Sequence, residues 1–207
     1  MDFNPTLELA KRIKAIAQIG LTYSLDEYNI ERYKELETIS HQLIREITGV
    51  PLEKISNFYI DAKEYPTSKT DIRAVIFNDQ HEILLVQEKS DNNWSLPGGW
   101  AEIGFSPKEV AVKEVAEETG LVVTADRLLA VLDKKHHAHP AELTYVYKYF
   151  IRCSVKAGTF NHAHDINNVS FFRQQNIPVL SENRVLRSQI DLMFEFLYNP
   201  DKEVVLD

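Results

Sequence analysis

The spacing of apolar residues changes near residue 66, and this change constrains the fold more than any other feature of the sequence. Up to about residue 50, apolar side chains recur every three or four positions, as they do on one face of a helix. From about residue 70 they form short runs that are typical of strands. We place the boundary in segment 64–68 and expect a helical N-terminal domain over residues 1–66 and an α+β domain over residues 67–207.

The first expected helix has clear local signals at both ends. Asn4 is suited to cap it, Pro5 suits the first helical position, and Gly20 predicts its end. The second expected helix ends at Gly49.

The start of the second helix is open between two signals. Ser24 with Glu27 has the spacing of a capping box, whereas Asn29 could cap a later start. Each helix carries one apolar stripe: Leu9, Ile13, Ile16 and Ile19 on the first, and Tyr33, Leu36, Ile39, Leu43 and Ile47 on the second. Two short helices cannot bury these stripes alone, so the rest of the chain or another subunit must cover them.

The second domain is expected to mix strands with two helices. Strands are predicted at 72–77, 83–86, 121–124, 128–132, 145–155 and 169–172. One helix is predicted at 107–119. A closing helix carries Leu186, Ile190, Met193 and Leu197 on one face and stops at Asn199 and Pro200.

The helix at 107–119 follows a glycine-rich loop. Ser106, Pro107 and Glu109 occupy the N-cap, N1 and N3 positions of a capping box, and Phe105 with Val110 has the spacing of a hydrophobic staple. The segment is therefore expected to be a loop, a capped helix and then a strand.

Three glutamates share one face of this helix. Glu114, Glu117 and Glu118 lie at i, i+3 and i+4, where like charges repel one another by a few tenths of a kcal/mol. A solvated acidic face is one explanation. A hard divalent cation, which prefers carboxylate oxygens, is the other.

The loop and helix together resemble the Nudix box, whose pattern is Gly, five residues, Glu, seven residues, then Arg-Glu-apolar-any-Glu-Glu-any-Gly-apolar. Seven of the nine specified positions match, namely Gly99, Glu114, Val115, Glu117, Glu118, Gly120 and Leu121. The resemblance implies a Nudix fold, in which helices sandwich a mixed sheet, and hydrolysis of a phosphoric anhydride.

Two positions depart from the box. Phe105 replaces its first glutamate and Lys113 replaces its arginine. In the family these two residues typically help to hold the loop against the helix, so the joint replacement is expected to remove one structural contact and no metal ligand. The staple of Phe105 with Val110 could substitute for that contact.

The resemblance also implies a metal site. Glu114 and Glu118 would be ligands of Mg²⁺, with Mn²⁺ possible, and Glu117 would be a ligand or the base that activates water. The main-chain carbonyl of Gly99 would complete the site. The family often adds an acid from a late loop, for which Asp165 is the candidate, although an aspartate that caps a turn explains it equally well.

The N-terminal half narrows the resemblance. Residues 20–33, together with the Gly98-Gly99-Trp100-Ala101 run, are similar to Nudix hydrolases with a helical N-terminal extension. That group is associated with nucleoside diphosphates linked to another moiety, including CDP-choline and ADP-ribose. Such enzymes are commonly dimers, so we expect a homodimer.

Three further residues are candidates for substrate binding. Lys135 and His139 belong to a basic, histidine-rich loop that could lie near an anionic substrate, could be plain surface, or less plausibly could bind zinc. Arg73, early in a strand, could bind phosphate or lie on a polar face of the sheet.

Charge and hydropathy limit the remaining classes of function. A formal net charge of −8 argues against broad binding to nucleic acid, although a local basic patch is not excluded. The N-terminus does not resemble a signal peptide and the apolar runs are too short to span a bilayer, so we expect a cytoplasmic protein that binds no membrane. Cys153, the only cysteine, is expected to be a buried thiol.

Two rival functions remain open. The departures at Phe105 and Lys113 are compatible with a Nudix-fold module that binds a nucleotide with little turnover. A hydrolase that processes RNA ends is the other rival, and it would favour a basic surface stripe.

Overall fold

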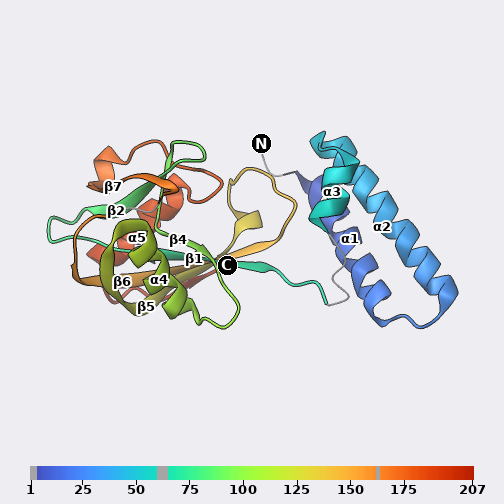
Figure 1. Cartoon of the computed structure of the whole chain (residues 1–207), viewed down its shortest axis with the longest axis horizontal. Helices are drawn as coiled ribbons and strands as arrows, with labels where there is room; N and C mark the ends of the chain where they lie inside the picture. Colours follow the sequence, from blue (N-terminus) through green and yellow to red (C-terminus); the bar gives the residue numbers. More distant parts are fainter. Residues whose placement is uncertain (1–3, 60–64, 162–163) are drawn as a thin grey trace. The chain divides into compact units, whose positions relative to one another are not determined.

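The computed structural model of the chain describes residues 4–59, 65–161 and 164–207 (Figure 1). The chain divides into two compact units, one made of Met1–Ser68 with Ala141–Thr144 and the other of Lys69–Pro140 with Tyr145–Asp207. The boundary expected after residue 66 lies two residues from this division, and position 64 of the expected linker lies outside the described residues.

The first unit is helical, and its elements are α1 (Pro5–Tyr23), α2 (Glu27–Thr48) and α3 (Leu52–Phe58). The Asn4 side chain caps α1, as expected, by accepting hydrogen bonds from the backbone N–H groups of the two residues after Pro5. The expected end at Gly20 is wrong, because α1 continues for three more residues. Both expected starts of α2 are also wrong, since Asp26 is its N-cap and accepts from the backbone N–H of Asn29.

Small residues let α1 and α2 approach each other closely. The Ser40 hydroxyl donates to the Ala10 carbonyl at 2.9 Å in the buried interface. A Cβ on Gly20 would lie 2.4 Å from the ring of Tyr33, so this glycine provides room for the aromatic ring of the facing helix.

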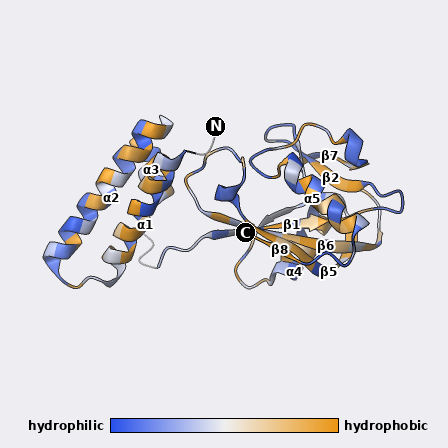
Figure 2. Cartoon of the chain, turned by 180° about the vertical axis from the view of Figure 1, so that it is seen from behind, coloured by the Kyte–Doolittle hydropathy of each residue, from blue (hydrophilic) through white to orange (hydrophobic). Residues whose placement is uncertain are grey.

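The helical core is small and contains Leu7, Ala10, Ile44 and Ile55. The two predicted apolar stripes lie largely outside this core, with Leu9 65% and Ile16 46% exposed. Figure 2 shows apolar residues, in orange, recurring along both helices.

The second unit contains two sheets and two main helices. One sheet has the order β4-β1-β6-β5-β8 and the other has the order β3-β2-β7. The strands are β1 (Lys69–Val75), β2 (Ile83–Glu88), β3 (Trp94–Ser95), β4 (Gly98–Trp100), β5 (Leu121–Asp133), β6 (Val146–Gly158), β7 (Ile166–Phe172) and β8 (Val205–Leu206). The helices are α4 (Pro107–Thr119) and α5 (Arg187–Tyr198), with 3-10 turns at Lys134–His136 and Gln174–Asn176.

The sheets lie between the two helices, each of which packs on its own apolar core. Val110, Ala111 and Val115 of α4 pack with Ile72, Leu84 and Ile151 of the strands. Ile190, Met193 and Phe194 of α5 pack in a second cluster with strand residues that include Val75 and Phe150. Parallel pairing of β1 with β6 and antiparallel pairing of β1 with β4 make the larger sheet mixed. The expected α+β class is confirmed.

The register of β1 prepares the site. Arg73 lies opposite Gly98 and Ile72 lies opposite Gly99, so the glycine pair forms part of the edge strand β4. Helix α4 packs on both β1 and β4.

No helix among the described residues is long and apolar enough to cross a membrane.

Candidate active site

Helix α4 is held in place by strong signals at both ends. The Ser106 hydroxyl accepts from the backbone N–H of Glu109, and the Glu109 carboxylate accepts from the backbone N–H of Ser106 at 2.7 Å. Gly120 ends the helix in the left-handed conformation, with φ of 75°. The predicted capping box and the predicted end are confirmed, so the glutamates are carried on a well-defined helix.

Glu118 reaches from α4 to the glycine pair of β4. Its Oε2 accepts the backbone N–H of Gly98 at 2.9 Å, and the residue is only 8% exposed. Gly98 has φ of 144°, and a Cβ there would lie 2.0 Å from the carbonyl oxygen of Ile72. Only glycine therefore lets β4 lie this close to β1 while presenting its N–H to the carboxylate.

Glu114 meets the second glycine of the pair. A Cβ on Gly99 would lie 3.0 Å from Glu114 Oε1 and 3.3 Å from Oε2, so this carboxylate packs directly against the backbone of β4. Glu114 and Glu118 are one helical turn apart, and both bring acidic oxygens to the same short stretch of main chain.

The surroundings of both carboxylates oppose their negative charge. Burial raises the pKa of Glu118 to about 8, because it outweighs the attraction of Arg73 and the hydrogen bond from Gly98. Burial also raises the pKa of Glu114, and the neighbouring Glu117 adds to that effect. A bound cation would relieve this unfavourable charge, so the pair fits a metal better than it fits a solvated acidic face.

Glu117 points to a different partner. Its carboxylate pairs with Lys113 Nζ at 2.9 Å, and the same Nζ reaches Glu102 of the preceding loop at 3.2 Å. Lys113 therefore does connect the helix to the loop, and the expectation of a lost contact is corrected. The contact is made to Glu102, whereas Phe105 offers no carboxylate.

Phe105 is 46% exposed while Val110 is buried, and their staple stays a prediction.

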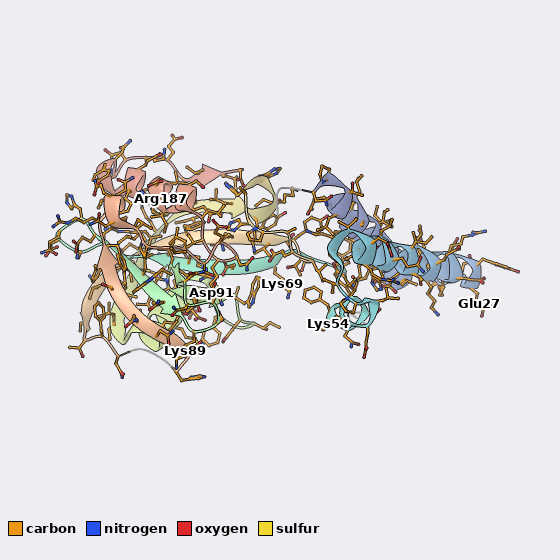
Figure 3. All side chains as sticks on the ribbon, turned by 90° about the horizontal axis from the view of Figure 1, so that it is seen from above. Glu27, Lys54, Lys69, Lys89, Asp91 and Arg187 are labelled. Carbon is orange, nitrogen blue, oxygen red and sulfur yellow. The ribbon has the colours of Figure 1, made fainter. Side chains whose placement is uncertain are left out.

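Glu88, at the end of β2, is a residue that the sequence reasoning missed. It is 7% exposed, forms an ion pair with Arg184 at 2.9 Å, and raises the pKa of Glu118 through its charge. The turn after it carries Lys89 and Asp91, both labelled in Figure 3, and Arg184 also lies 3.8 Å from Asp91. A glutamate directly after the apolar run of β2 was the available signal, but its burial depends on Arg184, a partner far away in the sequence.

Arg73 lies inside the protein, where it is 6% exposed. It therefore does not lie on a solvent-exposed polar face of the sheet. Its guanidinium binds Asp71, the Ser95 hydroxyl and the Leu96 carbonyl inside the protein. The substrate-binding assignment of Arg73 stays a prediction.

His139 also lies inside the protein. Its Nδ1 lies 2.5 Å from the carbonyl oxygen of Glu182 and its Nε2 lies 3.0 Å from the Gln189 amide nitrogen. Burial lowers the pKa of His139 to about 3, so the ring is neutral at pH 7 and offers no positive charge to a phosphate. The assignment of His139 to substrate binding stays a prediction.

The remaining two candidates stay predictions. Lys135 is partly exposed and pairs with Asp133 at 3.1 Å. Asp165 is exposed at the start of β7, where its backbone carbonyl accepts from the Lys89 N–H at 2.9 Å, and its charge contributes to the raised pKa of Glu88.

A cation would need some rearrangement of these groups. Among residues 4–59, 65–161 and 164–207, no three His, Cys, Asp or Glu side chains already stand together as a metal site. The donor chemistry nevertheless fits Mg²⁺, which takes one or two carboxylates and retains water ligands. The pair of Glu114 and Glu118 meets that requirement.

Comparisons with known proteins agree with this site. The NUDIX domain model matches residues 67–190, which is more than half of the chain, and a second model, described as the UDP-X-like N-terminal oligomerisation domain, matches residues 4–59. The chain belongs to the Nudix family and is a pyrophosphohydrolase.

Two relatives match nearly the whole chain, and a third matches about two thirds of it. It is 44% identical over 201 residues to the Bacillus subtilis (strain 168) protein YjhB, a provisional ADP-ribose pyrophosphatase by name, covering 97% of this chain and 96% of that protein. A crystal structure of a UDP-X diphosphatase matches over 100% of both chains with 30% identity and a TM-score of 0.64. An ADP-ribose pyrophosphatase from Streptococcus suis 89-1591 is 39% identical, with a TM-score of 0.61, over 68% of this chain and all of that one.

Proposed function

We propose that the enzyme hydrolyses the diphosphate bond of a nucleoside diphosphate linked to another moiety, releasing a nucleoside monophosphate and the phosphorylated moiety. The observation that carries this proposal is the convergence of the Glu114 and Glu118 carboxylates on the Gly98–Gly99 backbone. The names of the relatives support the substrate class, since they act on ADP-ribose or on UDP-linked compounds. CDP-choline belongs to the same chemical class.

Glu114, Glu118 and the carbonyl of Gly99 would hold the divalent cation, with Mg²⁺ as the first choice and Mn²⁺ as an alternative. A cation held there would supply positive charge to the diphosphate oxygens and would help to activate water. Glu117 is the third acid, as a ligand or as the base that accepts a proton from water. Its ion pair with Lys113 lies on the surface, where such pairs contribute about 0–1 kcal/mol, so the carboxylate is free to turn. Asp165 is a further acid and Lys135 a further contact for the anionic substrate.

A panel of substrates tests this function. The purified chain is incubated with ADP-ribose, UDP-glucose, CDP-choline, NADH and capped RNA, with Mg²⁺ or with EDTA, and the products are identified by mass spectrometry. We expect a nucleoside monophosphate from at least one of the small nucleotides and only with the metal. Turnover of capped RNA alone would favour the RNA-end reaction, and binding without any product would favour a nucleotide-binding module.

We also propose that the helical unit forms a homodimer. The predicted stripes of α1 and α2 contain large apolar residues in contact with solvent, with Leu36 37%, Ile39 40% and Leu43 37% exposed in α2. A two-fold interface would cover such a surface on both subunits at once. The match of this unit to an oligomerisation domain supports the proposal.

Light scattering on the full chain measures the dimer directly. We expect twice the chain mass at micromolar concentration, and a shift toward monomer when Leu9 and Ile16 are both changed to Glu. Lys34→Glu, at an exposed polar position of α2, is the matched control and should leave the mass unchanged. Deleting residues 1–60 should give a monomeric or aggregating product. A monomeric parent, or a truncated protein with full stability and activity, would contradict the proposal.

A further inference from the structure

Three charged side chains lie buried behind the glycine pair. Asp71 is 4%, Arg73 6% and Lys148 1% exposed, and Lys148 Nζ donates to Asp71 Oδ2. Buried ions carry a desolvation cost that well-packed apolar residues avoid, so a group of three needs an explanation beyond stability. Their charges sum to +1, and the excess positive charge of Arg73 faces Glu118 and Glu88.

The guanidinium of Arg73 makes hydrogen bonds in two directions. Toward the interior, Nε lies 3.0 Å from Asp71 Oδ2 and Nη2 lies 2.8 Å from Asp71 Oδ1. Toward the site, Nη1 donates to Ser95 Oγ and to the Leu96 carbonyl, both at 3.1 Å. The bidentate pair with Asp71 therefore sets the direction in which the remaining N–H groups point.

The acceptors on the site side belong to the segment that builds the candidate metal site. Ser95 and Leu96 lead directly into Gly98, whose N–H binds Glu118, and into Gly99, which packs against Glu114. Arg73 also lies opposite Gly98 in the β1–β4 pairing. The side chain of Arg73 thus binds the start of segment 95–99, while strand β1 pairs with its end.

We propose that Arg73, oriented by Asp71 and Lys148, is a positioning residue that holds segment 95–99 so that the main chain of Gly98 and Gly99 meets Glu118 and Glu114. This inference rests on the proposed function for the role of the two glutamates in binding metal. Arg73 acts through the main chain and contacts neither metal nor substrate. Lys148 donates to the same oxygen of Asp71, Oδ2, that accepts from Arg73 Nε, and so helps to hold that carboxylate in place.

A purely electrostatic role for Arg73 makes the opposite prediction for metal affinity. If only its positive charge mattered, removing that charge would tighten the binding of a cation at Glu118. If positioning matters, losing the fork weakens binding even when the charge is kept. Arg73→Lys and Arg73→Gln therefore separate the two roles.

The experiment measures Mn²⁺ binding to the full chain by electron paramagnetic resonance, without substrate, and the ¹H–¹⁵N signal of the Gly98 amide in the metal-free protein. We expect both Arg73 variants to bind Mn²⁺ about 10- to 100-fold more weakly, as is usual when a residue supporting metal ligands is lost. We also expect the Gly98 signal to move upfield as its hydrogen bond to Glu118 lengthens. Arg152→Lys, which alters a half-buried arginine that lies over the Phe77 ring, is the matched control and should change neither readout.

Unchanged or tighter Mn²⁺ binding in Arg73→Lys would overturn the proposal, as would a Gly98 signal at its parental position. If neither Arg73 variant folds, Ser95→Ala decides, because it removes one acceptor of the fork and leaves every charge in place. It should weaken Mn²⁺ binding and move the Gly98 signal in the same direction, and parental values for both would overturn the proposal. A parent chain that binds no Mn²⁺ would count against the metal site itself, while the Gly98 signal would still test the positioning.

Discussion

Replacing Glu118 with Gln should make the metal-free protein more stable at high pH, although it removes catalysis. Burial raises the pKa of Glu118 from 4.5 to about 8, so the folded state holds its proton where the unfolded state has lost it. The stability that this protonation contributes is present below pH 4.5 and is lost as the pH rises through 8. At 1.36 kcal/mol per pKa unit, ionisation of Glu118 costs the folded parent about 4 kcal/mol more at pH 9 than at pH 5. Gln has no such cost, and its amide oxygen can still accept the Gly98 N–H.

Urea unfolding of the parent and of Glu118→Gln at pH 5 and pH 9, in EDTA, measures this difference. The stability of the variant relative to the parent should increase by several kcal/mol between the two pH values. Adding Mg²⁺ at pH 9 should stabilise the parent, because the cation binds only the folded state, and should leave the variant unchanged. A variant whose stability relative to the parent is the same at both pH values would refute the reasoning about buried charge.

Three further changes probe other parts of the site. Gly98→Ala should prevent normal folding, because its Cβ would lie 2.0 Å from the carbonyl oxygen of Ile72; a circular dichroism melt like that of the parent would contradict this. His139→Gln should reduce the loss of folding stability at acidic pH. Burial lowers the pKa of His139 from 6.5 to about 3, so the stability of the neutral ring is lost as the pH falls from 6.5 toward 3. Between pH 7 and pH 5 the effect is about 2 kcal/mol in urea unfolding, at 1.36 kcal/mol per pKa unit, and a loss of stability equal to that of the parent would count against it. Phe105→Glu should change turnover little unless Lys113→Arg accompanies it, and purely additive effects in a double-mutant cycle would exclude coupling.

Elements with strong local signals could be predicted from the sequence. Helix α4 begins at Pro107 and ends before Gly120 as expected, because its capping box and terminal glycine act within a few residues of the ends. The strands expected at 121–124 and 128–132 are instead one strand, Leu121–Asp133, because pairing with β6 continues across irregularities in the register. The two-residue strands β3 and β8 are defined by their pairing with β2 and β5 and are too short to have a pattern of their own.

The same distinction holds for the site. Glu114 and Glu118 could be predicted because helical spacing alone places them on one face. The burial of Arg73 and His139 could not, since it depends on partners far away in sequence, such as Leu96 for the arginine and Glu182 for the histidine. Periodicity alone likewise did not show which face of α1 packs inside the helical unit.

The dependence of turnover on Mg²⁺ and on Glu118 tests the central claim most directly. The chain is freed of metal with EDTA and dialysed, and release of nucleoside monophosphate from its best substrate is then followed as Mg²⁺ is added. We predict no release without Mg²⁺, saturable release in the parent, and rates lower by orders of magnitude in Glu118→Gln at every concentration. Full activity in the metal-free parent, or parental rates in Glu118→Gln, would contradict the account.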